Sequence, residues 1–83
     1  MAHVIFVSTT FDPYTQGQEA IEVQATNLFG LVRELDARFP GIGRFIETSA
    51  SIAVDGEAIH AWTRALTNES EVVLFPKIAG GEA

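Results

Sequence analysis

A stripe of apolar residues between positions 26 and 40 constrains the fold more than any other feature of the sequence. Its members recur at steps of three and four residues: Leu28, Leu31, Val32, Leu35 and Phe39. This spacing places them on one face of a helix, with charged side chains on the other face. A chain of 83 residues makes one small domain, so the helix must bury that face against another layer.

Residues that favour helix ends flank this stripe. A side-chain oxygen of Thr26 or Asn27 can cap the first turn, and the proline after the last apolar position disfavours helical geometry before it. Gly30 costs about 1 kcal/mol inside a helix relative to alanine, which predicts close packing of the backbone on a sheet. Glu34 and Arg38 lie one turn apart, where they can form an ion pair.

Strand-like segments precede the helix. Residues 3–9, HVIFVST, are rich in β-branched and aromatic side chains and predict a strand that is buried on both faces. The next stretch, FDPYTQGQ, has turn residues, and residues 19–25 then alternate, with Ile21 and Val23 on one face. We expect these two strands to form a hairpin with a long loop.

The second half of the chain contains further short strands. Asp55-Gly56 lies between two strand-like runs and predicts a tight hairpin, because both central positions of that turn need positive φ; its acidic side chain is expected to be solvated. Residues 71–75, EVVLF, predict the final strand. The order of elements predicts an α+β fold, with a mixed sheet of four or five strands packed on one main helix.

The composition fits a packed domain. Hydrophobic residues make up 47% of the chain and charged residues 19%, a balance that argues against disorder. The sequence contains no cysteine, which excludes disulfides and thiolate chemistry. It has neither a signal-peptide pattern nor a long apolar run, so we expect a cytoplasmic protein that does not bind membranes.

The net charge narrows the choice of partners. Eleven acidic residues against five basic ones give a net charge of −6. This charge repels phosphate backbones and the bases do not cluster, so we expect no nucleic-acid binding. The acidic surface could attract a basic protein partner or serve only solubility.

Side chains that could carry chemistry are few and isolated. His3 and His60 have no partner at ligand spacing, so no metal site is expected. The hydroxyls of residues 8–10 lie near Asp12 without a nearby histidine to activate them, so no catalytic residue is expected. No phosphate-binding loop is present, so any ATP would be bound by a partner. Trp62 is assigned to packing at the sheet edge.

Three segments in a fixed order carry a family resemblance: LVRELDARFPGIGRFIE, IAVDGEAI and LTNESEVVLFPKIAGG. From Glu19 to Gly81 the chain resembles the MoaD/ThiS family of ubiquitin-like sulfur carriers. Members of that family have a helix that ends in Leu-x-x-x-Tyr/Phe-Pro-Gly, an Asn-Gly or Asp-Gly hairpin, an acidic Glu-Val strand and a tail with a terminal Gly-Gly. The tail is closer to the molybdopterin-synthase small-subunit pattern than to the thiamine pattern, although Lys77 replaces a frequent second proline.

The resemblance implies a ubiquitin-like β-grasp domain over residues 1–76 and a flexible tail over residues 77–83. In such domains the first and last strands lie side by side and parallel in the middle of the sheet. The two most apolar runs of this chain, residues 3–9 and 71–75, are the ones that this arrangement would bury.

The resemblance also implies a reaction at Gly81. In the family, the terminal glycine carboxylate is adenylated with ATP by an activating enzyme, and sulfide converts the adenylate to a thiocarboxylate. A terminal carboxyl has a pKa of about 3.5 and is ionised at neutral pH, so the carrier needs no base of its own. Lys77, Ala79 and Gly80 would form the arm, because glycine can thread a narrow channel.

Two residues, Glu82 and Ala83, follow Gly81 in this sequence. They displace a free carboxylate from Gly81 by about 7 Å of extended chain. The resemblance therefore implies that a processing protease cleaves between Gly81 and Glu82. If the pair stays on, the carrier interpretation fails.

Apolar residues around the end of the last strand predict a docking surface. Phe75 could equally complete the core, whereas Pro76 and Ile78 are expected to be exposed beyond the strand. The partners implied by the resemblance are the adenylating enzyme and a synthase large subunit. Two other functions stay open: a protein modifier conjugated through Gly81, and an interaction module with an inert tail.

Overall fold

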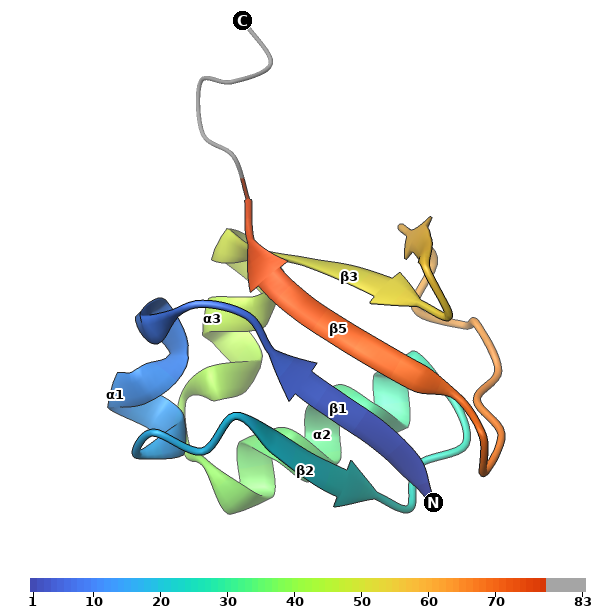
Figure 1. The fold of residues 1–83 in the computed structure, drawn as a ribbon, viewed down its shortest axis with the longest axis horizontal. Coiled ribbons are helices and arrows are strands. Elements are labelled where there is room, and N and C mark those ends of the chain that lie inside the picture. The colour runs from blue at the N-terminus through green and yellow to red at the C-terminus, as the bar shows by residue number, and fades with distance from the viewer. Residues whose placement is uncertain (78–83) are drawn as a thin grey trace, which may run out of the picture.

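A five-stranded sheet with its helices on one side makes up the fold (Figure 1). The computed structural model describes residues 1–77. The elements, in chain order, are β1 Ala2–Phe6, a 3-10 turn η1 Thr9–Phe11, α1 Asp12–Thr15, β2 Ala20–Val23, α2 Leu28–Arg38, α3 Ile42–Ser49, β3 Ala50–Val54, β4 Glu57–Ile59 and β5 Glu71–Pro76.

The first and last strands are neighbours at the centre of the sheet. The strand order is β2-β1-β5-β3-β4, and β1 and β5 are parallel with Val4 opposite Val72. The other three strand pairs are antiparallel. This mixed sheet confirms the β-grasp arrangement expected from the sequence.

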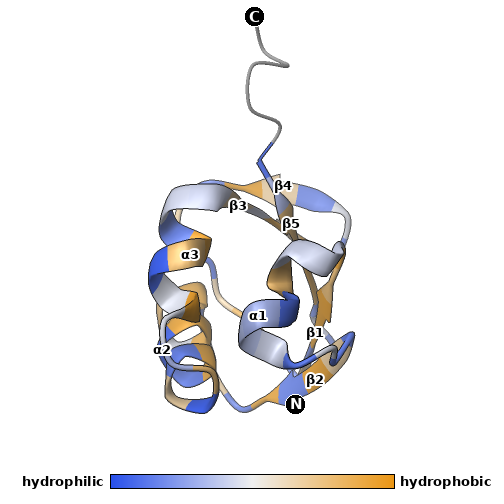
Figure 2. Cartoon of the chain, turned by 90° about the vertical axis from the view of Figure 1, so that its left-hand side faces the viewer, coloured by the Kyte–Doolittle hydropathy of each residue, from blue (hydrophilic) through white to orange (hydrophobic). Residues whose placement is uncertain are grey.

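Within residues 1–77, the helices cover only one face of the sheet, which corrects the expectation for the first strand. Figure 2 shows α1, α2 and α3 on the same side of the sheet. Along β1, Ala2, Val4 and Phe6 are buried against the helices, whereas His3 is exposed. The strand also ends at Phe6 and does not reach residue 9. Its side chains therefore alternate between a covered and an open face.

The segment expected to be a turn contributes to the core. Residues 9–15 form η1 followed directly by α1, and Phe11 at their junction is fully buried. Its ring centroid lies 5.6 Å from that of Phe6 and 5.4 Å from that of Phe45. Proline is favoured in the first turn of a helix, which explains why Pro13 does not prevent α1.

Helix α2 follows the predicted stripe, and Asn27 caps it. The Asn27 Oδ1 atom accepts a hydrogen bond of 2.7 Å from the backbone N–H of Gly30. The close neighbours of Gly30 are Ala25 and this same Asn27, so the expectation that Gly30 packs on the sheet was wrong. A Cβ at this position would lie 3.2 Å from Asn27 Oδ1, so the chain entering the helix, not the sheet, makes the close approach there.

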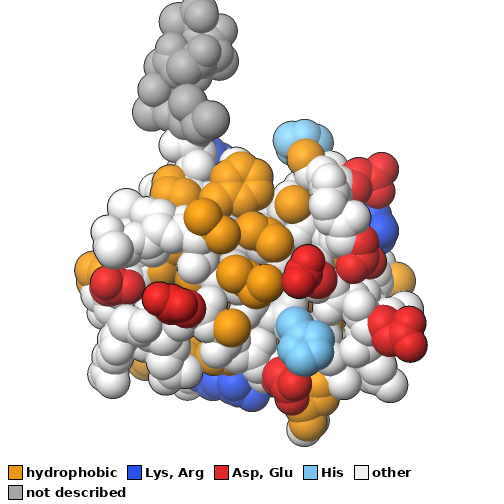
Figure 3. Space-filling model, in the orientation of Figure 1, with side chains coloured by type: hydrophobic (Ala, Val, Ile, Leu, Met, Phe, Trp, Pro, Cys, Tyr) orange, Lys and Arg blue, Asp and Glu red, His pale blue; other side chains and the backbone are white. Residues whose placement is uncertain are grey.

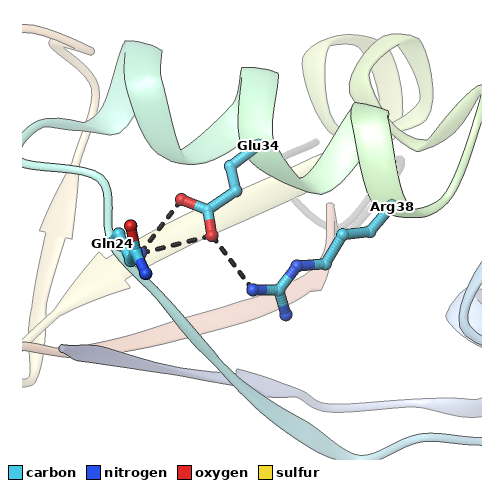
Figure 4. A network of polar contacts seen from close by, with 3 residues as sticks. All are labelled: Gln24, Glu34 and Arg38. Carbon is cyan, nitrogen blue, oxygen red and sulfur yellow. Dashed lines mark hydrogen bonds and ion pairs between the residues drawn. The ribbon is translucent and has the colours of Figure 1, made fainter.

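The predicted ion pair on α2 also ties the helix to the end of β2. Arg38 lies 3.1 Å from the carboxylate of Glu34. The same carboxylate accepts hydrogen bonds of 3.0 and 3.2 Å from the backbone N–H of Gln24 (Figure 4). Glu34 thus satisfies a backbone donor just beyond β2.

A second substantial helix, α3, replaces the single-helix architecture expected from the sequence. It begins directly after Gly41, whose φ of 96° lies in the left-handed region. Ile42 and Ile46 are buried against the rest of the core, and the helix ends where β3 begins. The burial of these two isoleucines outweighs the low helix propensity of the glycines around them.

The Asp55-Gly56 hairpin forms as predicted, with φ values of 51° and 86° at its two central residues. Beyond β4 the chain returns towards β5, and Trp62 packs edge-on against Phe29 of α2, with ring centroids 5.8 Å apart. In the part of the chain that the structure describes, no helix has the length and apolar character needed to cross a membrane.

Candidate functional site

The last described residue, Lys77, is still attached to the sheet. Its backbone N–H donates to the carbonyl oxygen of Ser49 at 2.9 Å, beyond the last residue of β5. Pro76 belongs to β5, opposite Ala50, and is half-buried, which corrects the expectation that it lies exposed beyond the strand. The tail therefore leaves the sheet from a fixed point beside the start of β3.

The remaining site residues expected from the sequence lie outside the described part of the chain. These are Ile78, Ala79, Gly80, Gly81 and Glu82.

An apolar cluster on the uncovered face of the sheet leads to this exit point. We call it the open-face patch; its members are Ile5, Ala53, Ala58, Val73 and Phe75. Strand register brings them together, because Val73 is opposite both Ile5 and Ala53, and Ala53 is opposite Ala58. Figure 3 shows hydrophobic side chains gathered on this face. Each of the five side chains is at least partly exposed, as expected for a face without helices.

Phe75 occupies the end of the patch that lies nearest the tail. It is opposite Ser51 in the β3–β5 ladder and is only partly buried. Its neighbour Leu74 faces the helices and is fully buried. Of the two alternatives for Phe75, the open face is thus the one observed, and its ring is available to a partner.

Acidic residues lie along the far side of the patch. Glu22 and Glu71 are exposed on either side of His3, to which both are opposite in the strand register. His3 Nδ1 lies 3.4 Å from the carboxylate of Glu22. An apolar surface with an acidic edge is complementary to a partner whose apolar surface has a basic edge.

Two of the isolated hydroxyl residues noted in the sequence, Ser8 and Thr10, form hydrogen bonds with each other. Ser8 Oγ accepts hydrogen bonds of 3.1 Å from both the backbone N–H and the hydroxyl of Thr10, which stabilises the turn η1. Among residues 1–77, no three His, Cys, Asp or Glu side chains are grouped so that they could hold a metal ion.

Sequence reasoning found Phe75 but missed the rest of the patch. The sequence predicts that Ile5 lies in a strand buried on both faces and Val73 in a strand that the β-grasp arrangement would bury. The alternation of Ile5 with buried Val4 and Phe6 carries no sign of which face is covered. The available signal was the single main helix of the prediction, since one helix covers one face of a sheet and leaves the other open.

Comparison with known proteins extends over nearly the whole chain. A model of the ThiS family matches residues 6–81. No curated protein matches the sequence at a significant level.

Solved structures share the fold at low sequence identity. CysO from Mycobacterium tuberculosis, described as an antigen, is similar with a TM-score of 0.84 and 19% identity, covering 94% of this chain and 100% of that chain. The small archaeal modifier protein 1 from Methanosarcina acetivorans has a TM-score of 0.79 and 14% identity, over 96% of this chain and 95% of that chain. A complex of subunits 1 and 2 of molybdopterin-converting factor from Helicobacter pylori 26695 contains a chain with a TM-score of 0.66 and 20% identity. The similarity covers 96% of this chain and 97% of that chain.

Proposed function

The chain belongs to the ThiS family of β-grasp sulfur carriers, whose members are not themselves enzymes, and from this premise we propose that it carries sulfur as a thiocarboxylate on Gly81. The observation that carries the proposal is the position of β5. This strand is central in the sheet and exposes Phe75 on the open-face patch, and the residue that follows it, Lys77, is held by a backbone hydrogen bond to Ser49. A partner that binds the patch would therefore meet the start of the arm, Lys77, in a constant position.

The chemistry needs three steps. First, a protease hydrolyses the peptide bond between Gly81 and Glu82, which leaves Gly81 with a free carboxylate. Next, this carboxylate attacks the α-phosphate of ATP held by the adenylating partner, and pyrophosphate leaves. Sulfide, as the second nucleophile, then attacks the acyl carbon and expels AMP, which gives the thiocarboxylate. The carrier supplies only the carboxylate and its placement, and members of its family bind no cofactor.

The open-face patch, with Phe75 at its tail end, is our candidate docking surface for the adenylating enzyme. Pro76 lies opposite buried Ala50 and alternates with Phe75 along β5, so it faces the covered side of the sheet. The acidic side of the patch would steer a partner with basic residues around its own apolar surface. A synthase large subunit could use the same patch later, since the arm must leave one partner before it enters the next.

Molybdopterin-type biosynthesis is the first acceptor pathway to test, because Phe75-Pro76 and the diglycine resemble the molybdopterin-synthase pattern. A second candidate function, conjugation to proteins through Gly81, is supported by the likeness to a structure described as a small archaeal modifier protein. Both functions use the same activated Gly81 and differ in the acceptor.

Mass spectrometry of the protein from its own cells tests this function. We expect a chain that has lost Glu82 and Ala83 and in which one terminal oxygen is replaced by sulfur. As a matched control, a chain engineered to end at Gly80 should not acquire sulfur in the presence of the adenylating enzyme, ATP and sulfide. An isopeptide adduct would favour the modifier function, and an exclusively intact 83-residue chain would contradict both.

A further inference from the structure

Two adjoining hollows form a groove along one side of the domain, which we call the side groove. The first hollow has a volume of about 710 Å³ and is bounded by β3, β4 and the end of α3. The second, of about 610 Å³, lies between α2 and α3. Phe29 and Trp62 line both hollows, so their rings form an apolar wall that runs from one to the other.

Backbone hydrogen bonds attach Trp62 and its neighbours to the start of α2. The N–H of Phe29 donates to the Trp62 carbonyl oxygen at 3.0 Å, and the N–H of Leu28 donates to the Arg64 carbonyl oxygen at 3.2 Å. The rings of Phe29 and Trp62 lie edge-on against each other, yet Phe29 is 52% exposed and Trp62 is only partly buried. An exposed apolar surface held in place in this way lowers the ordering cost of binding a partner.

Basic side chains without an ion pair gather around the side groove. Two of the five bases of the chain are paired, Arg38 with Glu34 and Arg64 with Glu57. The other three form no ion pair among residues 1–77, and all three line the groove: Arg33, Arg44 and Lys77. In a chain with a net charge of −6, the unpaired basic side chains of the described residues thus share one surface.

Two acidic residues also line the side groove, and one of them has a structural role. Asp36 Oδ1 accepts hydrogen bonds of 3.1 and 2.9 Å from the backbone N–H groups of Gly41 and Gly43, which hold the turn between α2 and α3. Glu47 is exposed, lines both hollows and forms no ion pair in the described part of the chain. An acidic ligand would therefore meet three bases, with Glu47 as the acid that most directly opposes it.

We propose that the side groove binds an acidic segment of a partner protein that also carries a large apolar side chain. The apolar side chain packs on Phe29 and Trp62, and the acidic groups pair with Arg33 and Arg44. Tryptophan and arginine are enriched among the residues that dominate the binding energy of protein interfaces, and here they line the same hollow.

The side groove and the open-face patch differ in the charge of the partner that they suit. The patch has an acidic edge at Glu22 and Glu71, whereas the groove is lined by unpaired bases. Phe75 and Ala58 border both surfaces, but no member of the patch lines the second hollow. Contacts in the second hollow therefore distinguish groove binding from patch binding, and groove binding does not depend on the proposed function of Gly81.

Peptide selection on the 83-residue chain tests the proposal, with a displayed library of random short peptides that lack tryptophan as the probe. We expect the selected peptides to be enriched in aspartate, glutamate and large apolar residues. We also expect them to shift the indole N–H signal of Trp62 in NMR spectra. Trp62 is the only tryptophan of the chain, so this signal reports directly on the groove.

Charge variants identify the groups involved. Arg33→Gln and Arg44→Gln should each weaken binding of the selected peptides by about threefold, as expected for an exposed ion pair. Glu47→Gln should strengthen binding by a similar factor, because it removes the opposing charge. Arg38→Gln is the matched control, since Arg38 lies on the same helix as Arg33 but pairs with Glu34 outside both hollows. This control should leave the affinity unchanged.

Three results would overturn the proposal. Selected peptides that leave the Trp62 signal unchanged would show that the groove is not a binding surface. Peptides that shift this signal but are not acidic, or that bind the Arg33→Gln and Arg44→Gln chains equally well, would remove the charge recognition. A Trp62 shift that grows with protein concentration, together with a dimer in sedimentation, would show that a second copy occupies the groove. Mass spectrometry of Gly81 tests carrier function separately, so failure of groove binding and failure of sulfur transfer can be told apart.

Discussion

Two hydrogen bonds between Asp55 and Glu71 join the hairpin turn to the first residue of β5. The backbone N–H of Asp55 donates to the Glu71 carbonyl oxygen at 2.8 Å, and the backbone N–H of Glu71 donates to Asp55 Oδ1 at 2.9 Å. The side chain expected to be only solvated therefore also fixes the register of the strand that bears the tail.

Replacing Asp55 should distinguish its two roles. Asp55→Ala removes the acceptor and places alanine at a φ of 51°, so we expect a loss of about 1–3 kcal/mol in the free energy of unfolding. Asp55→Asn keeps an acceptor oxygen and tolerates the left-handed conformation, and it should cost less than half as much. Urea unfolding of both variants measures the difference. Equal losses would argue against the side-chain bond.

Loss of the helix cap should be visible in the same assay. Asn27→Ala removes the acceptor for the Gly30 N–H and should lower the free energy of unfolding by about 1 kcal/mol. Thr26→Ala is the matched control, because Asn27, not Thr26, is the capping residue. If the two variants were equally stable, the cap would have no energetic role.

Phe11 should be among the most costly residues to truncate. It is fully buried between Phe6 and Phe45, so Phe11→Ala should cost about 3–5 kcal/mol. Phe29→Ala removes a ring that is 52% exposed and should cost far less. Thermal and urea unfolding compare the two. A small effect at Phe11 would mean that residues 9–15 do not belong to the core.

The open-face patch should matter for activation more than for folding. Val73→Asp places a charge among apolar side chains of the uncovered face, where it stays solvated, so the domain should still fold. We expect formation of the Gly81 thiocarboxylate by the adenylating enzyme to fall by at least about tenfold, since charged groups are disfavoured at interface cores. Arg38→Gln, on α2 and away from the patch and the hollow beside it, should leave the rate within about twofold. Full activity of the Val73→Asp chain would exclude the patch as the docking surface.

Local signals explain which parts of the fold were predictable. The stripe of α2, its cap and the Asp55-Gly56 turn are set by residues close together in sequence. Helix α3 was missed because glycines at positions 41 and 43 suppress helix propensity, and only the burial of Ile42 and Ile46 in the folded core compensates for them. The segment around Phe11 was missed for the same reason, since its turn residues gave no sign that the phenylalanine is buried.

The candidate site, too, has one part that could be predicted from local sequence and another that could not. Phe75 could be singled out from its position before the tail, which is a property of sequence alone. The open-face patch depends on which face the helices cover and on the order and register of the strands. These are properties of tertiary packing, and no short segment encodes them.

The central position of β5 has a consequence for synthesis of the protein. β1 and β3 both pair with this strand, so the sheet stays divided until the last strand has left the ribosome. Contacts that span nearly the whole chain form slowly, and here they cannot form early. Folding is thus completed only after translation of the segment directly before the diglycine. A prematurely terminated chain has neither a finished sheet nor a tail, so the partners of this protein encounter the diglycine only on molecules whose synthesis has reached the end of the domain.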